Sequence, residues 1–106
     1  MIVTTASVTM EKNDEKLFGL STGDGPIDAA FHALESITGT HYELDEFKIE
    51  SLTEGKDAAG RAIVKLRNNG IVYVGAGIST DIVGASIRAY VAALNKIAFS
   101  ENGENR

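Results

Sequence analysis

The sequence predicts an α+β fold with two similar halves, in the order β-β-α-β-β-β-α, whose sheets are covered by two helices. Three observations predict it. Several segments alternate apolar and polar residues, two others repeat apolar residues at helical spacing, and a glycine-bearing turn precedes each helical segment. The chain has 106 residues, 43% of them hydrophobic and 24% charged, which is the composition of one globular domain.

The first half should begin with a hairpin followed by a helix. Even positions between residues 2 and 10 are mostly apolar and odd positions mostly polar, and Leu17 to Leu20 form the returning strand after the turn residues Asn13-Asp14. A helix should start at Pro26, where the missing N–H of proline would be unpaired anyway. Gly39 should end it. Its apolar stripe is Ile27, Ala30, Phe31, Leu34 and Ile37.

The second half should hold three strands and a longer helix. The strands span residues 42–52, 61–67 and 71–77, and the turn Asn68-Asn69-Gly70 joins the last two. Ser79-Thr80-Asp81 supplies capping residues for a helix that runs to about Phe99. Its apolar residues are Ile82, Ala85, Ala89, Ala93 and Ile97. Residues 1–99 are therefore expected to be a single domain, and residues 100–106 a frayed polar tail.

The two halves resemble each other residue by residue. Val8, Met10, Phe18 and Gly19 match Val64, Leu66, Val74 and Gly75 at a spacing of 56, and Ile27 and Ala30 match Ile82 and Ala85 at a spacing of 55. Each half is a hairpin, a glycine-bearing turn and a helix. This repetition predicts a pseudo-twofold arrangement.

Charge and composition exclude several functions. The net charge of −5 opposes binding to nucleic acid, which needs clustered basic residues. Residues 27–98 have the element order of a double-stranded RNA-binding domain, but the last helix has no basic residue before Arg88. The chain has no cysteine, no apolar run long enough to span a membrane and no secretory signal, so we expect a cytoplasmic protein without a membrane partner.

Catalytic and metal-binding patterns are missing. His32 and His41 have no further metal ligand at useful spacing, and Asp45 and Glu46 are neighbours on a strand that point to opposite faces. The serines lack a nucleophile-elbow sequence, and Asp28 stands where a dinucleotide fingerprint needs its third glycine. We therefore expect no enzyme activity, no metal and no cofactor in this chain.

Small residues precede both helices and could admit a ligand. They are Gly23-Asp24-Gly25 and Gly75-Ala76-Gly77. A helix start offers unpaired N–H groups and a partial positive charge, so it attracts a carboxylate or a phosphate. The alternative interpretation, that these are ordinary strand-to-helix turns, stays open.

Three motifs carry a resemblance to a known family. They are Gly-Asp-Gly-Pro-Ile-Asp-Ala-Ala-Phe at residues 23–31, Thr-Glu-Gly-Lys-Asp-Ala at residues 53–58, and Gly-Ile-Ser-Thr-Asp-Ile at residues 77–82 followed by a helix that ends in Ala-Leu-Asn-Lys at residues 93–96. In this order they resemble the C-terminal regulatory domain of 2-isopropylmalate synthases and citramalate synthases. The likeness covers nearly the whole chain.

The resemblance implies that residues 1–99 are a regulatory, amino-acid-binding domain. In that family the domain binds leucine or isoleucine between its two halves, pairs in a homodimer and slows a distant acetyl-CoA-dependent catalytic barrel, which this chain lacks. The third motif is closer to isopropylmalate synthases, which favours L-leucine. L-Isoleucine, and a module that only dimerises, remain the alternatives.

The resemblance also implies the residues that bind the effector. The loop of Gly23, Asp24, Gly25 and Pro26, with the backbone of Ile27 and Asp28, would bind its carboxylate. Carbonyl groups of Ile78 and Thr80, on either side of Ser79, would bind its ammonium group. Its apolar side chain would lie among Ile27, Phe47, Ser51 and Ala58, and the strand register around Phe47 is left open.

Overall fold

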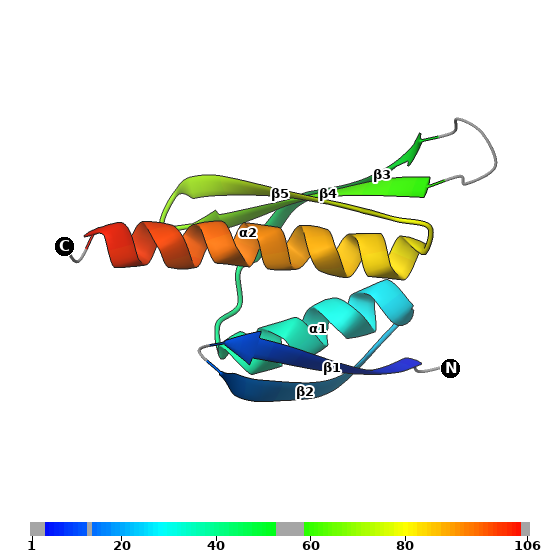
Figure 1. Ribbon diagram of the computed structural model, residues 1–106, viewed down its shortest axis with the longest axis horizontal. Coiled ribbons are helices and arrows are strands. Elements are labelled where there is room, and N and C mark those ends of the chain that lie inside the picture. Colours follow the sequence, from blue (N-terminus) through cyan, green and yellow to red (C-terminus); the bar gives the residue numbers. More distant parts are fainter. Residues whose placement is uncertain (1–3, 13, 53–58, 105–106) are drawn as a thin grey trace. The chain divides into compact units, whose positions relative to one another are not determined.

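The computed structural model describes residues 4–12, 14–52 and 59–104. It confirms the α+β fold and the element order β-β-α-β-β-β-α (Figure 1). The chain divides into two compact units, Met1–His41 and Tyr42–Arg106. Each unit holds one antiparallel sheet and one helix.

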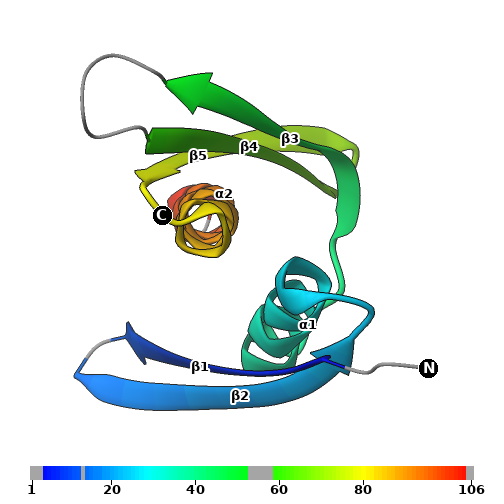
Figure 2. The same ribbon diagram turned by 90° about the vertical axis from the view of Figure 1, so that its right-hand side faces the viewer.

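Unit 1 is a hairpin covered by a helix. Strands β1 (Thr4–Lys12) and β2 (Glu15–Gly23) pair antiparallel, and α1 (Pro26–Thr38) packs on them (Figure 2). The helix begins at the expected proline. It ends at Gly39, whose φ of 71° allows its N–H to donate to the Glu35 carbonyl at 2.8 Å.

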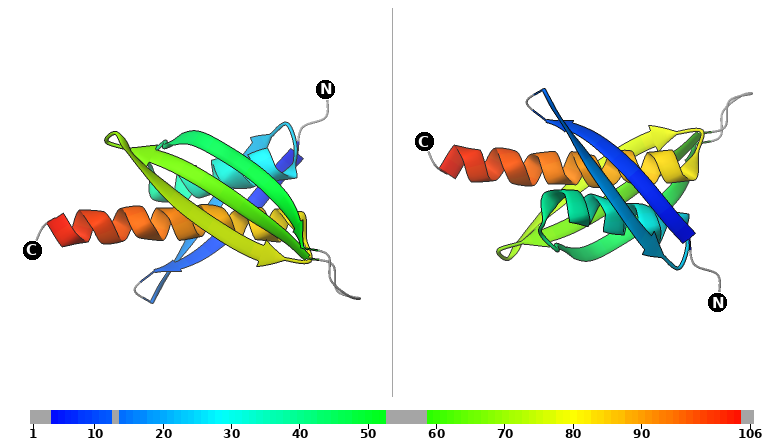
Figure 3. Two further views of the ribbon diagram at one scale, coloured as in Figure 1. Left: turned by 90° about the horizontal axis from the view of Figure 1, so that it is seen from above. Right: turned by 90° about the horizontal axis from the view of Figure 1, so that it is seen from below.

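Unit 2 is a three-stranded sheet with a helix on one face. Strands β3 (Glu43–Leu52), β4 (Ala59–Asn68) and β5 (Ile71–Ser79) lie in the order β3-β4-β5. Helix α2 (Ile82–Glu104) packs against β5 and β4, and the strands run across it on one side (Figure 3). Asn69 and Gly70 both have positive φ, 53° and 79°, as a two-residue hairpin turn requires. The core residues of the sheet face are Ala62, Val64 and Leu66, and those of the helix include Ala85, Ala89, Ala93 and Ile97.

Each helix approaches its sheet so closely that only glycine fits at the crossing. A Cβ atom on Gly19 would overlap the Ala33 carbonyl oxygen, and one on Gly75 would overlap the Ala89 carbonyl oxygen. The glycine precedes the alanine by the same number of residues in both units. The repeat therefore extends into the helices at a spacing of 56, and the spacing of 55 expected for Ile27 and Ile82 was wrong.

The helix starts give the same spacing. The Gly25 carbonyl accepts a hydrogen bond from the Ala29 N–H at 2.9 Å, and the Asp81 carbonyl accepts one from the Ala85 N–H at 2.9 Å. Pro26 and Ile82 are the first helical residues of α1 and α2. Gly25 and Asp81 are consequently equivalent residues of the two units.

Helix α2 continues through Glu104, beyond the end expected near Phe99. Two contacts hold this extra turn to the sheet of unit 2. The Tyr73 hydroxyl donates to Ser100 Oγ at 3.1 Å, and the Asn68 amide donates to Glu101 Oε1 at 3.3 Å. The part of the expected polar tail that the structure describes is thus helical.

By length and composition, Ile82–Glu101 of α2 is apolar enough to cross a membrane, with a mean hydropathy of 1.3. Within unit 2 its small residues Ala85, Ala89 and Ala93 are fully buried and lie beside the β5 glycines. A core helix packed on its own sheet has the same composition.

Candidate functional site

The two glycines of the loop before α1 differ in the space around them. A Cβ atom on Gly23 would meet the Asp28 carboxylate and the Ala29 backbone at 2.5 Å, so this glycine lies directly against the helix. Gly25 has an extended backbone, and apart from its two chain neighbours no atom of the described residues lies within 4 Å of the position its Cβ would take. Space is therefore available next to the start of α1.

The start of α1 has no side-chain cap. Gly25 offers no side-chain acceptor, and no side-chain cap hydrogen bond is formed at this end. Pro26 has no N–H, so the amide groups of Ile27 and Asp28 are the first that a bound anion could engage.

The start of α2 is capped by a carboxylate. Asp81 Oδ1 accepts a hydrogen bond from the Val83 N–H and Asp81 Oδ2 accepts one from the Gly84 N–H, both at 3.2 Å. Ser79 Oγ in turn accepts the Asp81 N–H at 3.2 Å. The capping function predicted for Asp81 is confirmed, whereas Ser79 contacts the backbone of Asp81, and the two helix starts differ in whether a carboxylate is built in.

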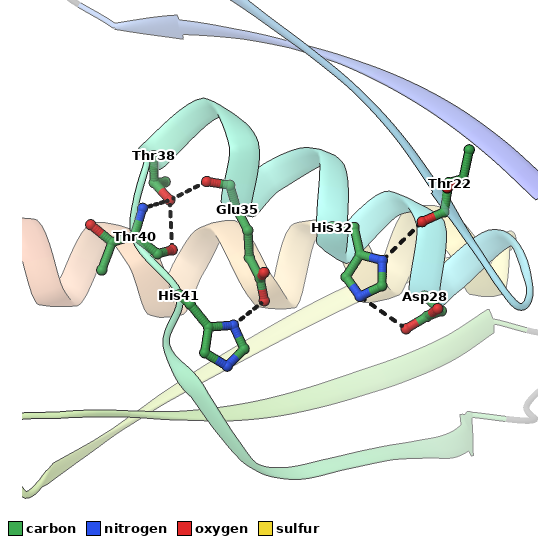
Figure 4. Close-up of polar contacts among 7 residues, drawn as sticks. All are labelled: Thr22, Asp28, His32, Glu35, Thr38, Thr40 and His41. Carbon is green, nitrogen blue, oxygen red and sulfur yellow. Dashed lines mark hydrogen bonds and ion pairs between the residues drawn. The ribbon is translucent and has the colours of Figure 1, made fainter.

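Four residues of unit 1 form a polar network around the loop, and Figure 4 draws three of them, Thr22, Asp28 and His32. His32 Nδ1 lies 2.9 Å from the Thr22 carbonyl oxygen, and His32 Nε2 lies 3.5 Å from Asp28 Oδ1. The Asp24 N–H donates to Asp28 Oδ2 at 3.0 Å. Sequence reasoning treated His32 as a helix-surface residue. The i,i+4 spacing from Asp28 was a usable signal for the ion pair, but the Thr22 contact depends on how α1 lies on β2.

The other histidine sits at the end of α1. His41 Nδ1 lies 3.0 Å from Glu35 Oε1, and the His41 side chain is 79% exposed (Figure 4). Both histidines line a shallow hollow of about 450 Å³ in unit 1, together with Ser21, Glu35, Ser36, Gly39 and Thr40. Among the described residues, no three His, Cys, Asp or Glu side chains are grouped so as to hold a metal ion.

Ile78 of unit 2 lines an electropositive hollow. This hollow, of about 660 Å³, is bounded by Arg61, Ala76, Gly77, Ile78 and Arg88. Neither arginine has an ion-pair partner within the described ranges. Two guanidinium groups beside Ile78 would attract an anion and would oppose an ammonium group at its carbonyl.

The register of β3 answers the question left open for Phe47. Phe47 pairs with Val64 and Ser51 pairs with Gly60, so both point to the face of the sheet on which α2 lies. The register shifts once, between Leu44 and Glu46, before either residue. Because α2 packs mainly on β4 and β5, the β3 part of this face carries half-exposed apolar residues. Ala58, the remaining residue expected there, lies outside the described residues.

Comparison with known proteins assigns the chain to a family. Residues 2–98 match the sequence model described as LeuA allosteric (dimerisation) domain. The chain belongs to this family.

Similar proteins are 2-isopropylmalate synthases. The chain is 45% identical over 104 residues to the one from Ruminiclostridium cellulolyticum, covering 98% of this chain and 20% of the relative. It is 44% identical over 99 residues to the one from Heliobacterium modesticaldum and 41% identical over 96 residues to the one from Pyrococcus furiosus, covering 93% and 90% of this chain and 19% of each relative. The LeuA allosteric domain thus spans about a fifth of these enzymes and matches only their regulatory portion. A dimerisation domain also implies self-association.

The acidic residues on β3 of this LeuA allosteric domain have separate partners. Asp45 Oδ2 lies 2.6 Å from Arg67 Nη2, and Glu46 Oε2 lies 2.7 Å from Lys65 Nζ. The hydrogen bond from Arg67 lowers the pKa of Asp45, and the hydrogen bond from Lys65 lowers the pKa of Glu46. Both carboxylates are therefore ionised at neutral pH, and they do not share a proton as a catalytic dyad would.

Proposed function

We propose that this LeuA allosteric domain senses L-leucine for a 2-isopropylmalate synthase, binding the amino acid's carboxylate at the loop of residues 23–25. The observation that carries the proposal is the difference between the two helix starts. Asp81 caps α2, whereas the equivalent Gly25 leaves α1 without a side-chain cap and with open space beside it.

The physical basis is the charge at a helix start. Unpaired N–H groups and the helix dipole stabilise an anion there by ~0.3–1 kcal/mol, and by about 2 kcal/mol where the site is partly buried. Asp81 provides an internal example of a carboxylate that accepts two backbone hydrogen bonds at this position. An external carboxylate would make the same interactions with the Ile27 and Asp28 amides.

The other groups of the effector are assigned by the family resemblance. The family resemblance gives its ammonium group to the carbonyls of Ile78 and Thr80 and its apolar side chain to Phe47 and Ser51. The Asp81 carboxylate, one residue after Thr80, favours a cation there, while Arg88 opposes it. Ala58 belongs to the same proposal by resemblance alone.

Regulation of the parent enzyme would follow from a difference in affinity. Leucine would prefer one arrangement of the paired domains, and that arrangement would hold an acetyl-CoA-dependent catalytic barrel in a slower state. The domain itself would supply no catalytic residue and no cofactor, and it would act in the cytoplasm as a homodimer.

Calorimetric titration of the domain with leucine and, separately, with isoleucine tests the proposal, with the oligomeric state measured by sedimentation. Tighter binding of leucine supports it. Tighter binding of isoleucine would assign the domain to a citramalate synthase instead. A folded dimer that binds neither would leave a module for dimerisation only and would contradict the proposal.

A further inference from the structure

Two side chains of α1 contact the backbone of the 23–25 loop and of the residue just before it. His32 contacts the Thr22 carbonyl on the strand side of the loop, and Asp28 accepts the Asp24 N–H within it. His32 and Asp28 contact each other at 3.5 Å (Figure 4), so the contacts run without a break from Thr22 of β2 through both side chains to Asp24 of the loop. All of them belong to unit 1.

The partners of His32 favour its doubly protonated form. A carbonyl oxygen only accepts hydrogen bonds, so Nδ1 must carry a proton to bond Thr22. In neutral His32 the Nε2 lone pair would then face the Asp28 carboxylate, which is also only an acceptor. Both contacts are favourable at once only when the ring is an imidazolium.

The charged groups around His32 act in the same direction. Its hydrogen bond with Thr22, followed by the carboxylates of Asp28, Glu35 and Asp24, raises the pKa of His32, and partial burial opposes this rise. Glu35 is also paired with His41, which lines the same hollow. The ring is 45% exposed, so protons exchange with solvent freely.

We propose that His32 and Asp28 are positioning residues for the effector-binding loop, and that protonation of His32 is required for its full affinity. The proposal rests on the function proposed above. With His32 charged, the Asp28 carboxylate is neutralised and the loop amide of Asp24 is fixed. When His32 loses its Nε2 proton, Asp28 presents an uncompensated negative charge at the start of α1, where the effector carboxylate binds. Leucine affinity should therefore fall as pH rises through the pKa of His32.

The test compares His32→Gln with His41→Gln in the whole domain. Glutamine can still donate to the Thr22 carbonyl but cannot become charged. Calorimetry between pH 5.5 and 8.5 should give wild-type leucine binding that weakens about threefold over this range, the size expected for a half-exposed ion pair. His41→Gln should keep this dependence and His32→Gln should lose it. Asp28→Asn keeps an acceptor for the Asp24 N–H but removes the carboxylate that His32 neutralises, so it should reduce the pH dependence.

A second measurement needs no effector. The ¹⁵N chemical shift of the Asp24 amide should follow the titration of His32 in the wild-type domain and stop doing so in His32→Gln. An amide shift that ignores His32, or a pH dependence of binding that survives His32→Gln, would overturn the proposal. Failure of leucine to bind at every pH would contradict the proposed function instead, and the amide titration would still decide whether His32 positions the loop.

Discussion

Gly25 and Asp81 hold the same position at the start of the two helices, 56 residues apart. Asp81 accepts hydrogen bonds from two backbone N–H groups, and Gly25 has no side chain with which to do so. A single carboxylate therefore distinguishes two otherwise similar helix starts. Among the described residues, the start of α1 lacks a side-chain acceptor for its first N–H groups.

Replacing Gly25 by aspartate should copy the start of α2 onto α1. The backbone of Gly25 is extended and, in the part of the chain that the structure describes, only its two chain neighbours come within 4 Å of a Cβ built there, so the side chain fits. The new cap should stabilise the domain by roughly a few tenths of a kcal/mol, because glycine is itself a tolerated cap residue, while its charge excludes the effector carboxylate and abolishes leucine binding. Urea unfolding and calorimetry measure the two effects.

Gly25→Ala is the matched control, because it adds a side chain without an acceptor or a charge. It should retain leucine binding within a few-fold. Wild-type affinity in Gly25→Asp would show that the effector carboxylate binds elsewhere.

Replacing Gly75 by alanine should destabilise unit 2. The added methyl group would overlap the Ala89 carbonyl and crowd Ala93, and neither backbone can move without shifting α2 on its sheet. Overpacking of this kind costs about 1–3 kcal/mol, or more where backbone must move. Gly60→Ala is the control, because its nearest neighbours lie 3.8–3.9 Å from the added atom. Equal urea midpoints for the two variants would contradict the close helix–strand contact.

Replacing Arg88 by glutamine should strengthen leucine binding if the effector ammonium lies at the Ile78 carbonyl. Arg88 and Ile78 line the same hollow, and removing a nearby positive charge should raise affinity about two- to fivefold. Arg67→Gln is the control, because Arg67 is paired with Asp45 and does not line this hollow, so removal of its charge should leave leucine affinity unchanged. If Arg88→Gln weakens binding, the hollow accommodates the carboxylate and the assignment of the two effector groups must be reversed.

Acid should weaken the domain partly through Asp45. The pKa of this carboxyl is lowered by Arg67, so its contribution to stability is present above the unfolded-state pKa of about 3.9 and is lost as pH falls through the folded-state pKa. Asp45→Asn should reduce the loss of stability between pH 5 and pH 3 in urea unfolding. Asp14→Asn, at an exposed turn residue without an ion pair among the described residues, should leave the loss unchanged.

Local sequence signals predicted the elements well because their causes are local. Pro26 begins α1, Gly39 ends it, and Asn69-Gly70 forms the turn between β4 and β5, all through backbone preferences of those residues. The repeat was also visible, since Gly19 and Gly75 are the residues on which it depends.

Features that depend on distant contacts were not predictable. The spacing between equivalent residues of the two helices is fixed by contacts across each unit, such as that of Gly75 with Ala89. Matching the apolar residues of the two helices in sequence therefore gave a spacing that was one residue too short. The last turn of α2 is held by Tyr73 and Ser100, which are far apart in sequence. The role of His32 depends on a backbone carbonyl ten residues away, which no side-chain pattern reveals.

The glycine crossings limit how this domain can transmit a signal. Because the helix backbone touches the strand at Gly75, rotation of α2 would bring a larger neighbour, Arg88 or Tyr90, into a space too small for a methyl group. Close-packed interiors of this kind resist deformation. Each helix and its sheet should therefore behave as one stiff piece, so the effector proposed above would act through loop movement or displacement of whole pieces, and not through sliding of a helix over its own strands.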